Sequence, residues 1–290
     1  MADEGGSALW KPLLILLVLA WPAAAQQQRV PLDGRYYLID LPDHPTGAMI
    51  LALHGAGGNP ALFARVAGLS APAMAQGYAV IYPAGSGQNG QLTWNAGYCC
   101  GYAQSAAVDD IGFLDQVVAD AAGRFSLDAT RVYLNGMSNG AMLAETYAVR
   151  RAGPVRAVAG VSGTLDIAAT RPVAVPLLHI HGTADQVVPY AGGTSTSGTV
   201  RFTGVADEVA AFLAVDGALT RTSRVIDPAD DGMSVTEDDY TDRNGHTRLR
   251  LMTVQGGRHV WPGQSGPQAK FSTRDIVASA EVLRFFAEHP

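Results

Sequence analysis

The fold is decided by residues 131–143, which read RVYLNGMSNGAML. A short apolar run at 132–134 predicts a buried strand, and the Ala-, Met- and Leu-rich residues after Gly140 predict a helix. Between them lies a G-x-S-x-G motif centred on Ser138, in the strand–turn–helix setting that a nucleophile elbow requires. The glycines leave room for the sharp turn, and the start of the helix presents amide N–H groups to developing negative charge. The motif therefore predicts a serine nucleophile, with a chance match in a chain of 33 glycines as the alternative.

A serine nucleophile needs a base and an acid that orients the base. Asp185 follows the apolar run 173–180 by a short HGTAD turn, and His259 follows a second apolar run at 248–254. The order serine, acid, histidine, each on a loop after a strand, is that of α/β-hydrolases. We therefore expect Ser138, Asp185 and His259 to form a catalytic triad.

A glycine-rich loop follows an early apolar run at 48–53 and reads HGAGGNP. In α/β-hydrolases the loop at this place supplies the second oxyanion donor, beside the amide that follows the nucleophile. We expect the amide groups of Ala56 and Asn139 to converge on one oxygen. An ordinary strand-to-helix turn is the alternative, although such a turn needs one glycine rather than three.

Two tryptophans lie on loops that we expect near the substrate. Trp94 belongs to an aromatic-rich loop after the strand predicted at 78–82, and Trp261 lies two residues beyond His259. Ligands of open α/β sheets bind at the carboxyl ends of the strands, where both loops begin. Both tryptophans are therefore candidates for binding the substrate, and packing beneath the loops is the alternative for each.

Strands and helices alternate along the chain, which predicts βαβ units and a mainly parallel sheet with helices on both faces. Asn244 and Gly245 predict the turn of a hairpin, and Asp109 and Asp110 predict the first turn of a helix. The further strands are expected at 35–41, 155–161 and 234–240, and the helices at 61–75, 205–215 and 271–287.

Composition places the chain among compact globular proteins. It has 290 residues, of which 48% are hydrophobic, and a formal net charge of −6, which argues against a nucleic-acid partner. The apolar run 13–20 is too short to span a bilayer and ends in small residues at 21–25, so residues 1–25 are predicted to be a signal peptide. We therefore expect one catalytic domain over 26–290, secreted or periplasmic and free of the membrane once cleaved; an uncleaved anchor is the alternative.

Two closely spaced pairs of residues raise the questions of a disulfide and of a metal site. Cys99 and Cys100 are adjacent, and either two packed thiols or a vicinal disulfide fits that spacing. His179 and His181 point to the same side of one strand, a spacing that can hold a metal. Because no compact set of other ligands completes such a site in the sequence, we expect no metal and a structural role for both histidines.

Five blocks of sequence together resemble the secreted esterases related to polyhydroxybutyrate depolymerases and feruloyl esterases. They are LHGAGGN, TWNAGYCCGYA with VDDIGFL, RVYLNGMSNGAM, HGTADQVVPY and GGRHVWPG. The resemblance implies an α/β-hydrolase fold and a Ser–His–Asp triad carried by Ser138, His259 and Asp185. It also implies hydrolysis of feruloyl or acetyl esters of plant polysaccharide, or of short hydroxyalkanoate oligoesters, through an acyl-enzyme without a cofactor. Because the chain stops at Pro290, without the substrate-binding domain that many such depolymerases carry, we expect no strong adsorption to solid polyester.

Three other functions compete with this interpretation. A serine peptidase of the same fold would share the motifs, but the sequence offers no added domain to select peptides. A metal-dependent hydrolase would have to be built on His179 and His181. A non-catalytic secreted binding protein on a hydrolase scaffold would typically lack one member of the triad, and all three residues are present here.

Overall fold

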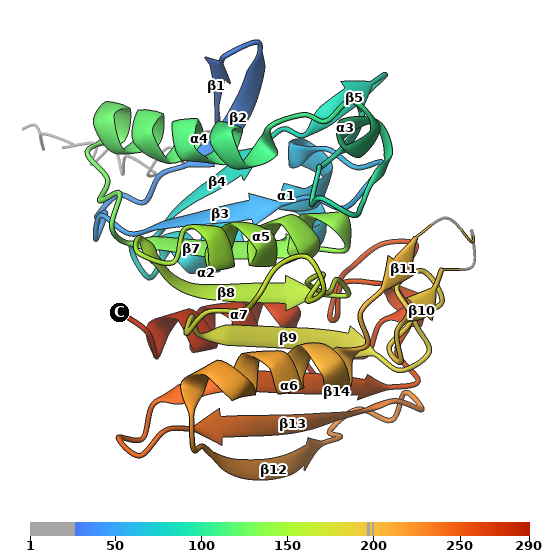
Figure 1. Cartoon of the computed structure of the whole chain (residues 1–290). Helices are drawn as coiled ribbons and strands as arrows, with labels where there is room; N and C mark the ends of the chain where they lie inside the picture. Colours follow the sequence, from blue (N-terminus) through green and yellow to red (C-terminus); the bar gives the residue numbers. More distant parts are fainter. Residues whose placement is uncertain (1–26, 196–197, 199) are drawn as a thin grey trace, which may run out of the picture.

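A ten-stranded sheet runs through the computed structural model, which describes residues 27–290 apart from 196, 197 and 199 (Figure 1). The predicted signal peptide lies outside these described residues. The six central strands pair in parallel, and the strands at both ends pair antiparallel, so the predicted mainly parallel sheet is confirmed. The strands, in their order across the sheet, are β1 (Gln28–Leu32), β2 (Arg35–Asp40), β4 (Ala79–Pro83), β3 (Met49–Leu53), β7 (Val132–Met137), β8 (Val155–Val161), β9 (Leu177–Gly182), β14 (Thr247–Gln255), β13 (Ser234–Thr241) and β12 (Thr220–Ile226).

Helices cover both faces of this sheet, as Figure 1 shows. One face packs against α4 (Asp110–Phe125), α5 (Asn139–Arg150) and α6 (Val205–Asp216), and the other against α1 (Pro60–Ala67), α2 (Ser70–Met74) and α7 (Ala278–Ala287). The central strands are apolar along nearly their whole length because both of their faces are buried. A short helix, α3 (Gly101–Ser105), and two small hairpins, β5–β6 (Ser86–Gln88, Gln91–Thr93) and β10–β11 (Gly193–Thr194, Arg201–Phe202), lie outside the sheet.

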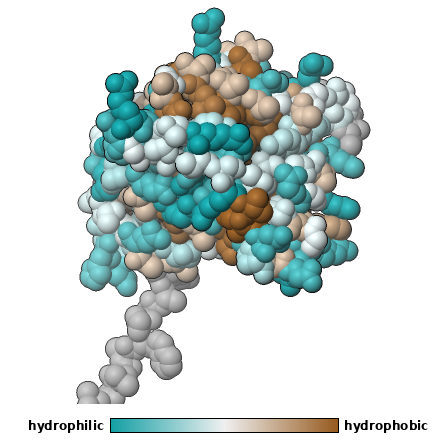
Figure 2. Space-filling view, turned by 90° about the horizontal axis from the view of Figure 1, so that it is seen from below, coloured by the Kyte–Doolittle hydropathy of each residue, from teal (hydrophilic) through white to brown (hydrophobic). Residues whose placement is uncertain are grey.

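Charged side chains protect the edge strand β12 from pairing with another sheet. Its residues are mostly exposed, and Arg221 and Arg224 pair with carboxylates of the neighbouring β13. Seen from below, the surface is mainly hydrophilic, with hydrophobic residues gathered in a few separate places (Figure 2). Charged side chains on an edge strand oppose pairing with a second sheet.

Two predicted helices are shorter than the sequence pattern indicated. The helix expected at 61–75 is broken after Ala67 because Gly68 adopts a left-handed conformation and caps α1, so α2 begins separately at Ser70. The helix expected at 271–287 begins only at Ala278. Before it lie a single 3-10 turn, Ala269–Phe271, and a stretch in which Ser272 bonds to the Trp261 carbonyl instead of capping a helix.

Other local predictions are confirmed. The hairpin of β13 and β14 turns at Asn244 and Gly245, where Gly245 has a φ of 86°. Asp109 caps α4 by accepting a hydrogen bond from the Gly112 amide, and Asp110 lies in the first turn. Cys99 and Cys100 form a vicinal disulfide across a cis peptide bond, which answers the question the sequence left open. None of the described helices is long and apolar enough to cross a membrane.

Candidate active site

Ser138 occupies a sharp turn between β7 and α5. Its φ of 56° and ψ of −127° lie outside the regions that non-glycine residues normally adopt, as expected for a residue held on an elbow. Gly136 and Gly140 make the turn possible. A Cβ on Gly136 would overlap the Gly140 backbone, and a Cβ on Gly140 would overlap the Leu53 carbonyl of β3. The motif therefore uses both glycines for close backbone packing.

A row of three side chains leads away from Ser138. The Ser138 hydroxyl lies 2.9 Å from Nε2 of His259, and Nδ1 of His259 lies 2.7 Å from Oδ2 of Asp185. An ionised carboxylate only accepts hydrogen bonds, so Nδ1 carries the ring proton and Nε2 presents its lone pair to the serine. The structure thus brings together the three residues that the sequence singled out, from loops at the carboxyl ends of β7, β9 and β14.

The Asp185 carboxylate is held in place from several sides. Its Oδ1 accepts hydrogen bonds from the amides of Val187 at 2.8 Å and Val188 at 2.9 Å. Burial alone raises the pKa of this carboxyl, but the hydrogen bonds from His181 and His259 outweigh burial and hold the pKa well below its usual range. Asp185 is therefore ionised at every pH at which an enzyme is normally assayed.

Comparison of the sequence with known proteins finds both a matching family and a related protein. Residues 40–175 match the family described as Esterase PHB depolymerase. The chain is 30% identical over 233 residues to "Putative esterase NocK" of Nocardia uniformis subsp. tsuyamanensis, an alignment covering 76% of this chain and 67% of that protein. The chain belongs to the Esterase PHB depolymerase family, whose members are α/β-hydrolase esterases.

Two further comparisons concern xylan esterases. The chain is 29% identical over 149 residues, half of its length, to the bifunctional acetylxylan esterase/xylanase XynS20E of Neocallimastix patriciarum, but this match spans only 20% of that protein. Its fold superposes on acetyl xylan esterase from Aspergillus awamori with a TM-score of 0.63, covering 91% of this chain and 99% of that chain at 13% identity. The expected α/β-hydrolase fold is thereby confirmed.

The glycine-rich loop of this esterase lies against the elbow. Its residues from His54 to Asn59 line one side of a cleft, and Ser138 and His259 line the other. The Ala56 amide has no hydrogen-bond acceptor among the described residues, and the Asn139 amide opens α5, where helical N–H groups lack partners within the helix. Ala56 thus lines the cleft, and Asn139 follows Ser138 directly at the start of α5.

His54 braces this loop, a role that the sequence analysis did not predict. Its Nε2 accepts a hydrogen bond from the Gly85 amide at 3.1 Å, so its Nδ1 carries the proton and donates to the Gly55 carbonyl at 2.8 Å. Burial, reinforced by the nearby charge of Arg35, lowers the pKa of His54 to about 4. The ring therefore stays neutral near pH 7 and joins the loop to the segment after β4.

The two tryptophans do not line the cleft, so their expected contact with substrate is not met. Trp94 is 0% and Trp261 1% exposed. The Trp94 indole donates to the His54 carbonyl, and its backbone exchanges two hydrogen bonds with the Asn139 side chain, at 2.7 and 2.9 Å. Trp261 packs edge-on against Phe63 beneath the cleft wall. Both tryptophans therefore have packing roles, the alternative held for each, and Trp94 links the glycine-rich loop to the elbow.

His259 stands between two hollows of different character. The cleft in front of it has a volume of about 280 Å³ and an apolar wall made by Leu62, Phe63, Val66 and Met137. The hollow behind it, of about 360 Å³, carries Gln186, Gln268 and Arg258, and the Arg258 guanidinium lies 4.8 Å above the Phe271 ring. The cleft is therefore mainly apolar, and the second hollow combines polar and apolar side chains.

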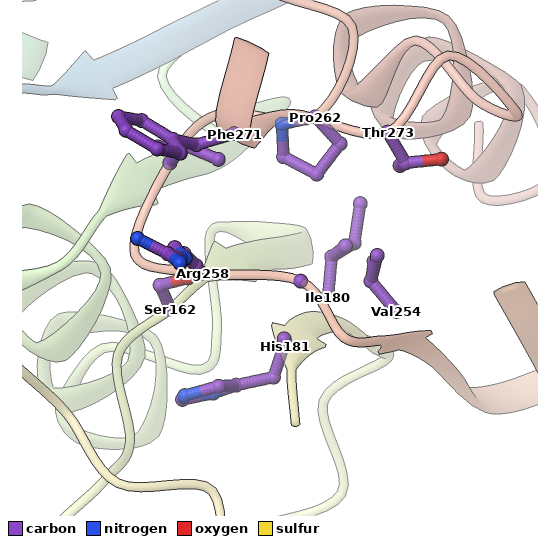
Figure 3. Close-up of a pocket in the computed structure, with 11 residues that line it drawn as sticks. Ser162, Ile180, His181, Val254, Arg258, Pro262, Phe271 and Thr273 are labelled. Atoms are coloured by element: carbon purple, nitrogen blue, oxygen red, sulfur yellow. The ribbon is translucent and has the colours of Figure 1, made fainter. Parts of the chain in front are cut away.

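The loop that carries His259 is packed firmly onto the sheet. Beneath it lies a small pocket of about 10 Å³, the space of one water molecule, lined by Arg258 and Pro262 of the loop and by Ile180 and Val254 of the strands (Figure 3). Phe271 and Thr273 line it beside Pro262. The loop that carries His259 therefore packs closely against β9 and β14.

His179 and His181 lie on β9 but do not reach the cleft. Both are fully buried, and their rings stack at a centroid distance of 5.3 Å. His181 approaches the triad from behind, with Nε2 3.5 Å from Oδ2 of Asp185. Glu145 and Glu208 lie beside His179, a grouping that sequence reasoning missed because their helices are far from β9 in the chain.

Proposed function

We propose that this esterase hydrolyses carboxylic esters through an acyl-enzyme on Ser138. The observation that carries the proposal is the hydrogen-bonded row from Ser138 through His259 to Asp185 at the mouth of an apolar cleft. His259 takes the hydroxyl proton as the serine oxygen attacks the ester carbonyl, and the Asp185 carboxylate stabilises the imidazolium that forms. His259 then protonates the leaving alcohol, and a water molecule, activated in the same way, releases the acid.

The charge that develops on the carbonyl oxygen needs hydrogen-bond donors. We assign this role to the amides of Ala56 and Asn139, since Ala56 lines the cleft with Ser138 and Asn139 follows Ser138 at the start of α5. A donor of this kind typically lowers the barrier by about 3 kcal/mol. His54 and Trp94 support the assignment, because His54 joins the loop to the segment after β4 and Trp94 bonds to both the loop and the elbow.

The two hollows beside His259 suggest which ester is cleaved. The acyl group lies in the apolar cleft with the oxyanion loop, and the alcohol lies on the far side of His259, which protonates it. Gln186, Arg258 and Gln268 offer donors and acceptors to hydroxyl groups there. We therefore favour acetyl or feruloyl esters of plant polysaccharide, with short hydroxyalkanoate oligoesters as the second candidate. The names of the acetylxylan esterases among the similar proteins accord with the first.

Two experiments test this function. A fluorophosphonate probe should label the purified protein at Ser138, as peptide mass spectrometry would show; absence of labelling would favour a non-catalytic binding protein. A panel of acetylated xylan, methyl ferulate, hydroxybutyrate oligomers, p-nitrophenyl esters and a peptide substrate then ranks kcat/KM. Preference for the peptide would turn the assignment toward a serine peptidase.

We further propose that the protein is secreted or periplasmic. The support is the apolar run at 13–20 followed by small residues at 21–25, a pattern typical of a cleaved signal peptide. Expression of the full sequence in a bacterial host, followed by cell fractionation and N-terminal sequencing, tests this. A mature protein that begins near residue 26 outside the cytoplasm is the expected result.

A further inference from the structure

Two carboxylates and an imidazole meet in the interior, on the side of the sheet covered by α5 and α6. Glu145 comes from α5, Glu208 from α6 and His179 from β9, and all three are 0% exposed. Nδ1 of His179 lies 3.0 Å from Oε2 of Glu208 and 3.8 Å from Oε1 of Glu145. One ligand atom from each of the three residues lies within 4.8 Å of the other two. We call this group the buried Glu–His–Glu cluster.

The ligand atoms of the cluster lack partners. Both oxygens of Glu145, Oε2 of Glu208 and Nδ1 of His179 have no hydrogen-bond partner in the described part of the chain, whereas Oε1 of Glu208 accepts from the Leu165 amide. The backbone makes room for the Glu145 carboxylate, because a Cβ on Gly160 would occupy the place of its Oε1. Buried polar atoms are nearly always satisfied, so four unsatisfied atoms that face one another require an explanation.

The hydrogen-bond chain behind His179 determines which of its nitrogens is free. The Val188 carbonyl only accepts, so Nε2 of His181, 2.9 Å away, carries the proton of that ring. In a neutral His181, Nδ1 then holds a lone pair and accepts the Nε2 proton of His179 at 3.1 Å. Nδ1 of His179 is left with its lone pair directed at two carboxylates. A metal-binding histidine has this arrangement, with one nitrogen free and the other donating to a second group.

We propose that Glu145, His179 and Glu208 bind a divalent transition-metal ion. When ionised, two carboxylates beside a neutral imidazole carry two negative charges in a fully buried site, and one divalent cation balances them. Imidazole together with carboxylate favours zinc or a similar transition metal over magnesium or calcium. The three residues are buried away from the cleft, so the ion is structural: it holds α5 and α6 to β9, the strand that leads to Asp185.

Metal analysis of the pure wild-type chain tests this directly. Protein folded in cells grown with added zinc should contain about one equivalent of transition metal per chain by inductively coupled plasma mass spectrometry. Crystals of that protein should show an anomalous difference peak at the zinc edge between Nδ1 of His179 and the two carboxylates. The Glu145→Gln/Glu208→Gln variant should lose the metal. The Asp242→Asn/His246→Asn variant, which removes an exposed carboxylate–histidine pair, should retain it.

A second measurement does not depend on whether the cluster variant folds. Wild-type protein refolded from denaturant with a chelator present should regain about 5 °C or more in Tm when zinc is added after the chelator is removed. The proposal is overturned if the wild-type chain contains less than about 0.1 equivalent of any transition metal and its Tm does not change when zinc is added. In that case protons, shared among the two carboxyls and His179, bridge the cluster. The readouts are metal content and stability, so they stand apart from the esterase assignment.

Discussion

At the scale of single residues, the site consists of groups whose protonation follows from their neighbours. The Asp185 carboxylate fixes the proton of His259 on Nδ1 and so turns the Nε2 lone pair toward Ser138. His54 is fixed in the same way by one donor and one acceptor of the backbone. Each of these assignments predicts what a single substitution does.

Ser138→Ala should lower ester hydrolysis by about a millionfold, as loss of a nucleophile does in serine hydrolases, while leaving the fold intact. The side chain lies at the mouth of the cleft and contributes little to the core. Hydrolysis of p-nitrophenyl acetate, with circular dichroism and Tm as folding controls, checks this. Retention of more than a trace of turnover would show that another group attacks the ester.

Asp185→Asn should lower kcat by about 10⁴, because an amide favours the wrong tautomer of His259. The matched control is Asp166→Asn, a change in a loop carboxylate that only accepts from the Ala168 and Ala169 amides. Steady-state kinetics of the two variants should differ by orders of magnitude. Similar rates for both would remove Asp185 from the mechanism.

His259→Ala should abolish turnover, whereas His246→Ala should leave kcat and its pH profile unchanged. His246 is exposed beside the turn of the β13–β14 hairpin, where its ring pairs with Asp242. The same ester assay from pH 5 to pH 9 compares the two variants. An active His259→Ala enzyme would contradict the proposed base.

At the scale of secondary-structure elements, Trp94 joins the oxyanion loop after β3 to the start of α5. Its indole N–H and its backbone reach the two segments that carry the proposed oxyanion donors. The loops at the ends of parallel strands are therefore held to one another as well as to the sheet. Spacing of this kind matters for a reaction in which donors must meet a developing charge.

Trp94→Phe should lower kcat by about ten- to a hundredfold for every ester in the panel, with little change in KM. The ring volume is largely retained, but the His54 carbonyl loses its donor, so the loop shifts while the cleft wall is unaltered. Kinetics on acetyl and feruloyl esters separate kcat from KM. A rise in KM confined to one substrate would instead indicate that Trp94 contacts the substrate.

At the scale of the whole molecule, acid should destabilise the fold through His54. Its pKa is about 4 in the folded state and about 6.5 in an unfolded chain, so the unfolded chain binds the proton more readily. The His54 contribution therefore leaves stability unchanged above about pH 6.5. It should reduce the free energy of unfolding as the pH falls toward 4, by up to about 1.4 kcal/mol per pH unit and about 3 kcal/mol in all.

Urea unfolding of the wild type and of His54→Gln between pH 7 and pH 4 measures this contribution. The variant should be less stable at pH 7 but lose less stability on acidification, because glutamine does not titrate. Other buried groups, such as His181, titrate in both proteins and cancel in the difference. Parallel pH dependences would mean that His54 is more accessible to water than the structure indicates.

The sequence by itself determined the architecture and the positions of the three triad candidates. Strand periodicity and the G-x-S-x-G turn are local properties, and parallel strands bring their carboxyl ends to one edge, so residues distant in sequence were predicted to meet. The catalytic role of that row stays a prediction until the substitutions are made. The apolar spacing did not predict two helix boundaries. The first helix ends early because Gly68 caps it, and the last helix begins late, at Ala278, because Ser272 bonds to the Trp261 carbonyl instead of capping a helix.

Only the tertiary structure decided that the two tryptophans are buried and that two glutamates lie beside His179. An aromatic residue on a loop looks the same in sequence whether it faces substrate or core, and the packing of Trp94 between two segments placed it in the core. Glu145 and Glu208 look like ordinary helical carboxylates. They meet because α5 and α6 lie on the same face of the sheet, over β9, and that packing creates a cluster of charge that no local pattern contains.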